Sequence, residues 1–309
     1  RRQHNKPRPY TTKIMAMNIL ENVVLAPLTY YKIGGPARFY CQPESTDYLK
    51  QAADFIRKNK LPYFVLGAGS NILVADAGFD GLILHTNKLD RTLLKTQMPD
   101  GTNALATGCS VMVIQALRIA MSEGLSGLEF LVGIPGNMGG VFYMNAGTML
   151  GEAKDALLEV SVFDLNTQTK RTIARDEMSY TYRAQKYLNP HDIILGGKLS
   201  VKVTDPKTVQ EQVTMLLTNR KKSQPIDKPS CGSVFKNPRD HATLKNAWQV
   251  IEKVGLRGHQ IGGAQVSPMH TNYIVNLGGA TASDVQALIA EAKSRAKTQL
   301  GIALEEEVK

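Results

Sequence analysis

Two glycine-rich stretches are the segments of this chain best suited to holding a ligand through the main chain. The first, Gly67-Ala68-Gly69-Ser70-Asn71-Ile72, follows an apolar run, and the second extends from Gly133 to Gly147. Glycine tolerates left-handed backbone angles and lets the backbone approach a ligand closely. Loops of this kind can therefore aim consecutive N–H groups at a phosphate.

Neither stretch is a standard nucleotide motif. No Gly-Lys-Ser/Thr follows, so a P-loop is excluded, and the first turn has no third glycine. Its continuation, Ile72-Leu73-Val74, is expected to be extended, whereas a Rossmann turn leads into a helix. With Gly34-Gly35-Pro36-Ala37 upstream, the two stretches predict a dinucleotide whose diphosphate is cradled by main chain; a plain tight turn is the alternative for the first stretch alone.

Three further segments carry polar residues suited to acid–base chemistry or to binding an anion. They are Tyr182-Arg183, the string Cys231-Gly232-Ser233-Val234-Phe235-Lys236-Asn237-Pro238, and the end Leu304-Glu305-Glu306-Glu307-Val308-Lys309. Each has an ordinary alternative. Arg183 is compatible with a surface arginine, Ser233 with turn chemistry, and Glu307 with a solvated acidic end.

Together these segments resemble the UDP-N-acetylenolpyruvoylglucosamine reductase (UDP-N-acetylmuramate dehydrogenase) family. The similarity runs from about Leu20 to the last residue, in the same order and at family-like spacing, and Gly-Ser-x-Phe-Lys-Asn-Pro is its most specific element. The resemblance implies an α+β protein, with an FAD-binding fold of the vanillyl-alcohol-oxidase (PCMH) type in two subdomains followed by a C-terminal α+β substrate domain. It also implies NADPH as reductant. Relatives that attach FAD covalently often have a His in the glycine-rich turn; this turn has Ser70, so we expect non-covalent FAD.

The reaction implied is reduction of UDP-N-acetylglucosamine enolpyruvate to UDP-N-acetylmuramate, in peptidoglycan precursor synthesis. Hydride passes from FAD N5 to the enolpyruvyl methylene carbon, and the neighbouring carbon becomes enolate-like. By similarity, Arg183 holds the substrate carboxylate, a protonated Glu307 stabilises the enolic group, and Ser233 donates the proton.

The resemblance also implies binding residues. Those for substrate are Tyr182, Arg183, Lys236 and Asn237. Those for FAD are Gly67, Ala68, Gly69, Ser70, Asn71, Ile72, Gly133, Ile134, Pro135, Gly136, Gly139, Gly140, Ala146 and Gly147. Gln265 and His270 are weaker candidates. Because no second dinucleotide motif is visible, we expect NADPH and the sugar nucleotide to use one cleft in turn, with ping-pong kinetics.

Apolar periodicity predicts the elements that position these residues. In the N-terminal half we expect a βαβ-like unit, with a helix capped at residues 45–47 between two extended runs, and a second such unit around a helix that ends at Gly124. Strands and a hairpin at Asp164 to Thr167 are expected to follow. Beyond Pro206 we expect two amphipathic helices, a strand, a longer helix with a capping box at Ser283 and Gln286, and a final strand over 302–309. These elements indicate a basic flexible tail (1–17), two FAD-binding subdomains (18–84 and 85–205) and a substrate domain (206–309).

The positive net charge is also compatible with a nucleic-acid-binding protein. The 309 residues include 37 Lys and Arg against 27 Asp and Glu, a net charge of +10, and five of these charges fall within the first thirteen residues. A basic nucleic-acid-binding protein using this tail and the cluster Arg220, Lys221, Lys222 and Lys228 is one alternative. Without interleaved aromatic residues, a solvated surface is favoured for the cluster, and an anionic ligand is the second reading.

Other patterns limit the location and the cofactors. The N-terminal segment has no apolar region typical of a secretory signal, and no apolar run is long enough to cross a bilayer. Cys41, Cys109 and Cys231 are far apart, as expected of reduced thiols, and histidine spacing supports no metal site. We therefore expect a cytoplasmic protein with no nucleic-acid or membrane partner. Another FAD-dependent oxidoreductase of the same fold, acting on a small alcohol or hydroxy acid, is the remaining alternative.

Overall fold

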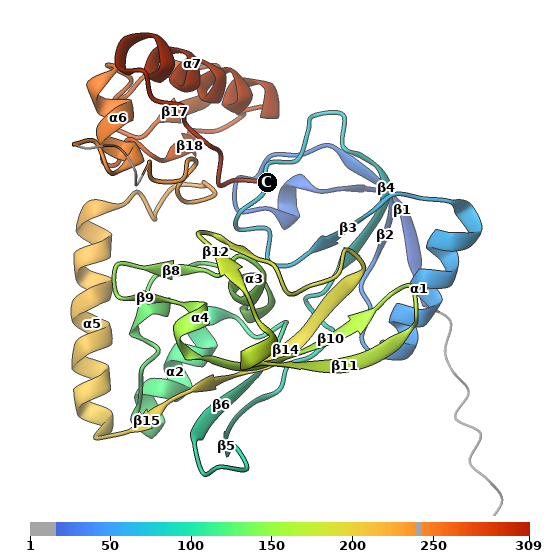
Figure 1. Cartoon of the computed structure of the whole chain (residues 1–309). Helices are drawn as coiled ribbons and strands as arrows, with labels where there is room; N and C mark the ends of the chain where they lie inside the picture. Colours follow the sequence, from blue (N-terminus) through green and yellow to red (C-terminus); the bar gives the residue numbers. More distant parts are fainter. Residues whose placement is uncertain (1–16, 239–240, 242) are drawn as a thin grey trace, which may run out of the picture.

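The computed structural model describes residues 17–238, 241 and 243–309. The predicted tail, residues 1–17, lies outside this part apart from Met17. Two sheets form the N-terminal two-thirds of the chain, and a long helix leads from the second sheet to a smaller C-terminal group of helices and strands (Figure 1). The content of helices and strands is that of the expected α+β class.

The first sheet has the strand order β1-β2-β4-β3. Its strands are β1 (Ile19–Val24), β2 (Pro36–Cys41), β3 (Tyr63–Leu66) and β4 (Phe79–His85). The pair β1–β2 is antiparallel, while β2 and β3 both pair with β4 in parallel. Helix α1 (Thr46–Asn59) connects β2 to β3, and the Ser45 hydroxyl caps it by accepting a hydrogen bond from the N–H of Tyr48. The predicted βαβ-like unit is therefore confirmed, with β4 lying between its two strands.

The second sheet is antiparallel and has the order β11-β10-β14-β6-β5. Its strands are β5 (Leu93–Gln97), β6 (Asn103–Gly108), β10 (Leu157–Asp164), β11 (Thr169–Ala174) and β14 (Asp192–Ser200). Helix α2 (Val113–Glu123) ends at Gly124, which has a φ of 63° as a left-handed C-cap requires. The prediction of a second βαβ-like unit was wrong. The strand after α2, β7 (Leu125–Ser126), pairs antiparallel with β15 (Lys202–Val203), outside this sheet.

Short helices and strands lie in the connections between the strands of the two sheets. They are the 3-10 helices η1 (Ala26–Leu28), η2 (Glu129–Leu131) and η3 (Arg175–Glu177), helices α3 (Met138–Tyr143) and α4 (Ala153–Ala156), and strands β8 (Gly147–Thr148), β9 (Gly151–Glu152), β12 (Tyr180–Thr181) and β13 (Ala184–Gln185). All except η1 come from the chain between α2 and β14. In Figure 1, α3, β8 and β12 lie between the second sheet and the C-terminal elements, so this part of the fold faces the C-terminal group.

The C-terminal group follows helix α5 (Pro206–Ser223). It contains α6 (Ala247–Lys253), the antiparallel strands β16 (Gln260–Ile261), β17 (Ala264–Val266) and β18 (Ile274–Asn276), and α7 (Ala282–Leu300). The cap of α7 is Thr281, two residues before the predicted Ser283. Thr281 accepts from the N–H of Asp284, and the Asp284 carboxylate accepts from the N–H of Thr281, so the capping box uses these two residues.

Residues 302–309 were expected to form a strand, but they form only an isolated bridge between Glu306 and Phe235. The alternation that suggested the strand is nevertheless real, because Ile302 and Leu304 are both buried. The segment 72–74 after the first glycine-rich turn is likewise not helical and belongs to no sheet.

Two large cores cross the predicted domain boundaries. The larger one contains Leu49 from α1, Leu105 from the second sheet and Val213 from α5. The core of the C-terminal group includes Tyr31 and Ile33 from the N-terminal region. The boundaries at 84/85 and 205/206 stay predictions. Among the helices of the described residues, none is long and apolar enough to span a membrane.

Candidate active site

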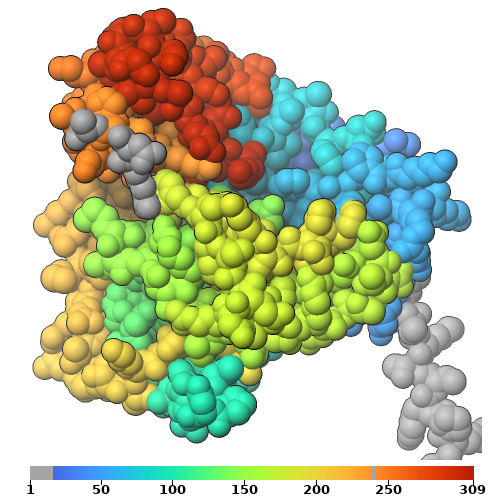
Figure 2. Space-filling view, viewed as in Figure 1, coloured from blue at the N-terminus to red at the C-terminus, as the bar shows by residue number. Residues whose placement is uncertain are grey.

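A cleft of about 890 Å³ lies where the two glycine-rich stretches, the turn between β12 and β13, and the C-terminal group meet. The C-terminal segment lies next to the part of the chain around residue 180 on the face seen in Figure 2. Most of the predicted site residues line this cleft: Gly67, Ala68, Gly69, Ser70, Asn71, Ile72, Ile134, Pro135, Gly139, Gly140, Ala146, Gly147, Tyr182, Arg183, Ser233, Asn237 and Glu307. Gly133, Gly136 and Lys236 are not among the lining residues.

The two glycine-rich stretches touch each other at one wall of the cleft. The Ser70 hydroxyl donates to the carbonyl of Pro135 (3.2 Å). Gly136 has a φ of 108°, and a Cβ there would lie 2.5 Å from Ser70 Oγ. A Cβ on Gly67 would lie 2.9 Å from Asn137 Oδ1. The φ of Gly136 favours glycine, and at both positions a side chain would crowd the contact, so the wall that results is bare backbone of the kind that fits the diphosphate of a dinucleotide.

The second stretch contributes less main chain to a ligand than the sequence suggested. The N–H of Gly139 donates to the carbonyl of Cys109 (3.0 Å), and the N–H of Gly140 donates to Asn137 Oδ1 (3.1 Å). The first bond ties helix α3 to the residue that follows β6, and the second is the N-cap of α3 itself. Gly133 has a φ of 74°, and a Cβ there would lie 2.2 Å from Arg220 Cδ, so this glycine accommodates an arginine from α5.

Arg183 projects into the cleft from a strained turn. It has a φ of 59° in the two-residue connection between β12 and β13, and its side chain is only 17% exposed. Nη2 donates to the carbonyl of Gly147 (3.0 Å), and Nε lies 3.2 Å from a carboxylate oxygen of Glu307. Nε and Nη1 are buried and make no well-aligned hydrogen bond to the described residues. Buried guanidinium donors in this state are suited to a carboxylate ligand.

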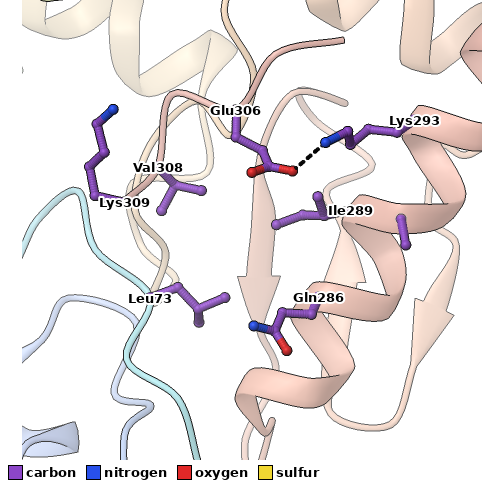
Figure 3. A pocket seen from close by; sticks show the side chains of 8 residues that line it. Leu73, Gln286, Ile289, Lys293, Glu306, Val308 and Lys309 are labelled. Atoms are coloured by element: carbon purple, nitrogen blue, oxygen red, sulfur yellow. Dashed lines mark hydrogen bonds and ion pairs between the residues drawn. The ribbon is translucent and has the colours of Figure 1, made fainter. Parts of the chain in front are cut away.

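Glu307 reaches the same point from the C-terminal segment. Its side chain is 17% exposed, and burial raises the pKa of its carboxyl above the ordinary value, with a smaller opposing effect from the cations of Arg183, Lys236 and Lys309. The adjacent glutamates point elsewhere. Glu306 pairs with Lys293 of α7 at 2.8 Å on the reverse side of the segment (Figure 3), and Glu305 is exposed and pairs with Lys236. The register therefore brings Glu307 alone of the three to Arg183.

Ser233 is held by the segment that follows it. Gly232, with a φ of 74°, turns the chain, and the N–H of Val234 donates to the carbonyl of Asn272 (2.8 Å). The Asn272 side chain then bonds both the N–H and the carbonyl of Phe235, at 3.0 and 2.9 Å. Ser233 is therefore fixed at the wall of the cleft by the contacts that Asn272 makes with the main chain on its C-terminal side.

The two predicted substrate residues after Ser233 already have partners. Lys236 is paired with Glu305, outside the lining of the cleft. Asn237 lines the cleft, and its Oδ1 accepts from the N–H of Ala247 (2.9 Å) at the start of α6. Tyr182 lines the cleft with its ring 5.1 Å from Arg183 Cζ.

Sequence reasoning missed part of the opposite wall. Arg220, treated above as a member of a solvated cluster, lines the cleft, and its Nη1 donates to the carbonyl of Val132 (3.1 Å). Tyr273 also lines it and donates to Gln224 Oε1 (2.8 Å), and burial lowers the pKa of the neighbouring His270. Helical periodicity in the sequence could have indicated this, because Arg220 and Gln224 continue the face of α5 that carries the buried Val213.

Cys231 is not a reactive thiol in this arrangement. It is buried, its Sγ–H donates to the carbonyl of Ile72 (2.9 Å), and burial raises its pKa to about 12. A thiol in this state is inert as a nucleophile at neutral pH.

The fold and the cleft define an FAD-binding protein: residues 37–172 match the family model for the FAD binding domain. Residues 224–309 match the model for the C-terminal domain of UDP-N-acetylenolpyruvoylglucosamine reductase. Relatives of the same name from Synechococcus sp. (strain JA-3-3Ab) and Listeria monocytogenes are 38% and 37% identical, over 98% and 96% of this chain and 94% and 96% of their own. The chain belongs to the UDP-N-acetylenolpyruvoylglucosamine reductase family.

A solved structure agrees over nearly the whole chain. The crystal structure of UDP-N-acetylenolpyruvylglucosamine reductase from Thermus caldophilus superposes with a TM-score of 0.78 and 33% sequence identity, covering 95% of this chain and 98% of that one. The resemblance stated from the sequence motifs is therefore confirmed, as is the α+β fold with an FAD-binding part.

Proposed function

We propose that this protein is an NADPH-dependent flavoenzyme that reduces UDP-N-acetylglucosamine enolpyruvate to UDP-N-acetylmuramate in peptidoglycan precursor synthesis. The observation that carries the proposal is the meeting of Arg183 with Glu307 in the cleft that Ser233 also lines, beside the bare backbone of Gly67 to Ile72. Family membership supports this reaction over an oxidase of similar fold and over a nucleic-acid-binding protein.

FAD would be held non-covalently by the first glycine-rich turn, with Pro135 and Ile134 at its side. The glycines at 67 and 136 support this assignment, since a side chain at either position would fill the contact between the two stretches. When bound, FAD accepts a hydride from NADPH and supplies one to the methylene carbon of the substrate. Residues 139 and 140 would contribute by packing, because their N–H groups are already bonded within the protein.

Side chains of the protein would stabilise the negative charge on the substrate and supply the proton. The guanidinium of Arg183 would bind the substrate carboxylate, where negative charge grows as the neighbouring carbon becomes enolate-like. Glu307, whose pKa is raised by burial, would in its protonated form donate a hydrogen bond to the same group. Ser233 would then deliver its hydroxyl proton to the enolic carbon, which completes the lactyl ether.

Sugar-nucleotide binding would involve Tyr182, Asn237 and Lys236. Lys236 would have to exchange its partner Glu305 for the ligand, since it stands outside the lining of the cleft. We also propose that the enzyme acts in the cytoplasm, and that residues 206–309 form the substrate-binding unit beyond the two FAD-binding subdomains.

Anaerobic absorption spectroscopy tests the proposed function directly. The purified protein is expected to show a flavin spectrum, to be bleached by NADPH, and to regain its colour when the enolpyruvyl sugar nucleotide is added. A flavin whose colour returns with a small keto acid but not with the sugar nucleotide would favour the oxidoreductase alternative. A colourless protein that does not take up FAD and binds DNA with steep salt dependence would favour the third reading.

A further inference from the structure

The residues just after the glycine-rich turn contact both segments that carry the proposed acid groups. The side-chain Nδ2 of Asn71 donates to the main-chain carbonyl of Glu307 (3.1 Å), and the Asn71 carbonyl accepts from the N–H of Lys309 (3.1 Å). The N–H of Leu73 donates to the carbonyl of Lys309 (2.7 Å). Between them, Ile72 accepts from the thiol of Cys231, two residues before Ser233.

We propose that Asn71 is a positioning residue for Glu307, so that the turn facing FAD also sets the place of the carboxyl group that faces the substrate. This inference rests on the proposed function. Glu307 is held from two sides: its N–H donates to the carbonyl of Val234 (2.8 Å), next to Ser233, and its carbonyl accepts from Asn71. The two bonds hold the peptide groups on either side of the Glu307 Cα, so they fix where the side chain leaves the main chain.

Among the bonds between the turn and the C-terminal segment, the one from the Asn71 amide is made by a side chain. The other bonds between the turn and the C-terminal segment are main chain to main chain, and they remain when the side chain changes. On the reverse side, Leu73 faces Val308 and α7 across a smaller pocket of about 480 Å³ (Figure 3). Because this side of the segment borders a pocket, we expect the segment to shift when the Asn71 bond is lost.

Coupling through Asn71 has to act in both directions. If FAD orders the turn and the turn orders Glu307, then loosening Glu307 must weaken FAD binding by the same factor. The groups that face Glu307 are Arg183 from the β12–β13 turn, Lys236 from the Ser233 segment, Lys309 from its own segment, and Tyr273, whose pKa responds to Glu307. Displacement of the carboxyl from this set changes its pKa, so the coupling has a signature besides the rate.

The experiment compares Asn71→Leu with wild-type protein, both saturated with FAD. Loss of one hydrogen bond at a fixed group is expected to slow flavin reoxidation by the enolpyruvyl sugar nucleotide about tenfold, and to leave reduction by NADPH within about twofold. Hydrogen–deuterium exchange of the peptide spanning residues 302–309 is expected to quicken about tenfold, and the FAD dissociation constant to rise by a comparable factor.

Ser70→Ala is the matched control, because Ser70 lies in the same turn and bonds Pro135 rather than the C-terminal segment. It is expected to weaken FAD binding without quickening exchange at 302–309. Equal slowing of both half-reactions in Asn71→Leu, or unchanged exchange there, would overturn the proposal. Asn71→Asp keeps the shape and replaces the donor with an acceptor, so it decides the question if the Leu variant does not fold.

Failure of the proposed function gives a different result. Wild-type flavin would then not be reoxidised by the sugar nucleotide at all, whereas exchange at residues 302–309 and the FAD dissociation constant would still report whether Asn71 holds the segment.

Discussion

At the scale of single residues, the cleft combines groups whose surroundings match the chemistry proposed for them. Burial raises the pKa of the Glu307 carboxyl above its ordinary value, while Arg183 keeps two buried nitrogens without well-aligned partners among the described residues. Ser233 has a fixed backbone and an ordinary hydroxyl. A weak acid of this kind is suited to protonating a strongly basic carbon, since the driving force lies in the basicity of the acceptor.

Ser233→Ala tests the proton-donor role. Flavin reduction by NADPH is expected to change less than about twofold, because no proton from Ser233 enters that step, while reoxidation by the sugar nucleotide slows by about 10² to 10⁴. Stopped-flow absorbance of the flavin measures both steps. Equal losses in the two steps would assign Ser233 to binding or folding instead.

Glu307→Gln tests the carboxyl. The role proposed for Glu307 requires its protonated form, so the reoxidation rate is expected to fall as pH rises through the Glu307 pKa, which burial places above that of an exposed glutamate. Glu307→Gln is expected to slow reoxidation by orders of magnitude and to abolish this alkaline fall. Single-turnover rates across pH measure both effects.

The neighbouring glutamates are the controls for this change. Glu305→Gln and Glu306→Gln remove charges that pair with Lys236 and Lys293 at the surface, so both are expected to be mild and to keep the alkaline fall. If Glu305→Gln proved the severe variant, the assignment of Glu307 would be wrong.

At the scale of elements, local patterns predicted much and tertiary contacts decided the rest. The cap at Ser45 and the C-cap at Gly124 follow from residue type alone, and both are present. Ser283 does not cap α7 because its N–H and its hydroxyl both donate to Asp76, a contact between distant segments, while Thr281 and Asp284 form the capping box. The left-handed turn at Arg183 had no signal either, since arginine does not favour that conformation.

The contact between the two glycine-rich stretches can be tested with Gly136→Ala. The added Cβ meets Ser70 Oγ in a backbone conformation that disfavours a side chain, so we expect a loss of about 1 to 2 kcal/mol in stability and a clear rise in the FAD dissociation constant. Gly101→Ala is the matched control. It also has a positive φ, of 86°, but its Cβ meets nothing within 4 Å and it lies in the β5–β6 hairpin, so only stability is expected to fall. Flavin fluorescence titration and thermal unfolding separate the two effects.

At the scale of the whole molecule, the two parts of the chain are joined by specific polar contacts between residues that do not line the cleft. Asp76, from the loop after the glycine-rich turn, accepts from the N–H of Ala282 and of Ser283 and from the Ser283 hydroxyl, at 2.7 to 3.0 Å. Asn276 of β18 donates to the carbonyl of Tyr31 (2.9 Å). The sequence could not predict such pairs, because the partners lie more than 200 residues apart and no local pattern marks them. The residues of the candidate site were predicted from the family resemblance instead.

The Asp76 contact predicts a pH-dependent junction. These hydrogen bonds lower the Asp76 pKa below its ordinary value, so their contribution is present above the unfolded-state pKa and is lost as pH falls through the folded-state pKa. Asp76→Asn is expected to quicken amide exchange at the start of α7 at neutral pH, and the difference from wild type should shrink in acid. Asp100→Asn removes a similarly bonded carboxylate from the β5–β6 turn and should leave α7 unchanged. Exchange at α7 that is insensitive to Asp76→Asn at neutral pH would refute the contact.

One cleft for two substrates has a consequence for the order of the reaction. Arg183, Ser233 and Glu307 line the same cleft as the turn proposed to hold FAD, so we expect the sugar nucleotide and NADPH to reach the flavin through the same space, one after the other. In that arrangement NADP⁺ leaves before the sugar nucleotide enters, and initial rates measured at several fixed concentrations of one substrate should give parallel double-reciprocal lines. Each substrate at high concentration should compete with the other, because both contain anionic diphosphates that suit the same positive wall around Arg183 and Arg220. Intersecting lines without substrate inhibition would mean that both ligands are bound together, and would require separate entrances to the flavin.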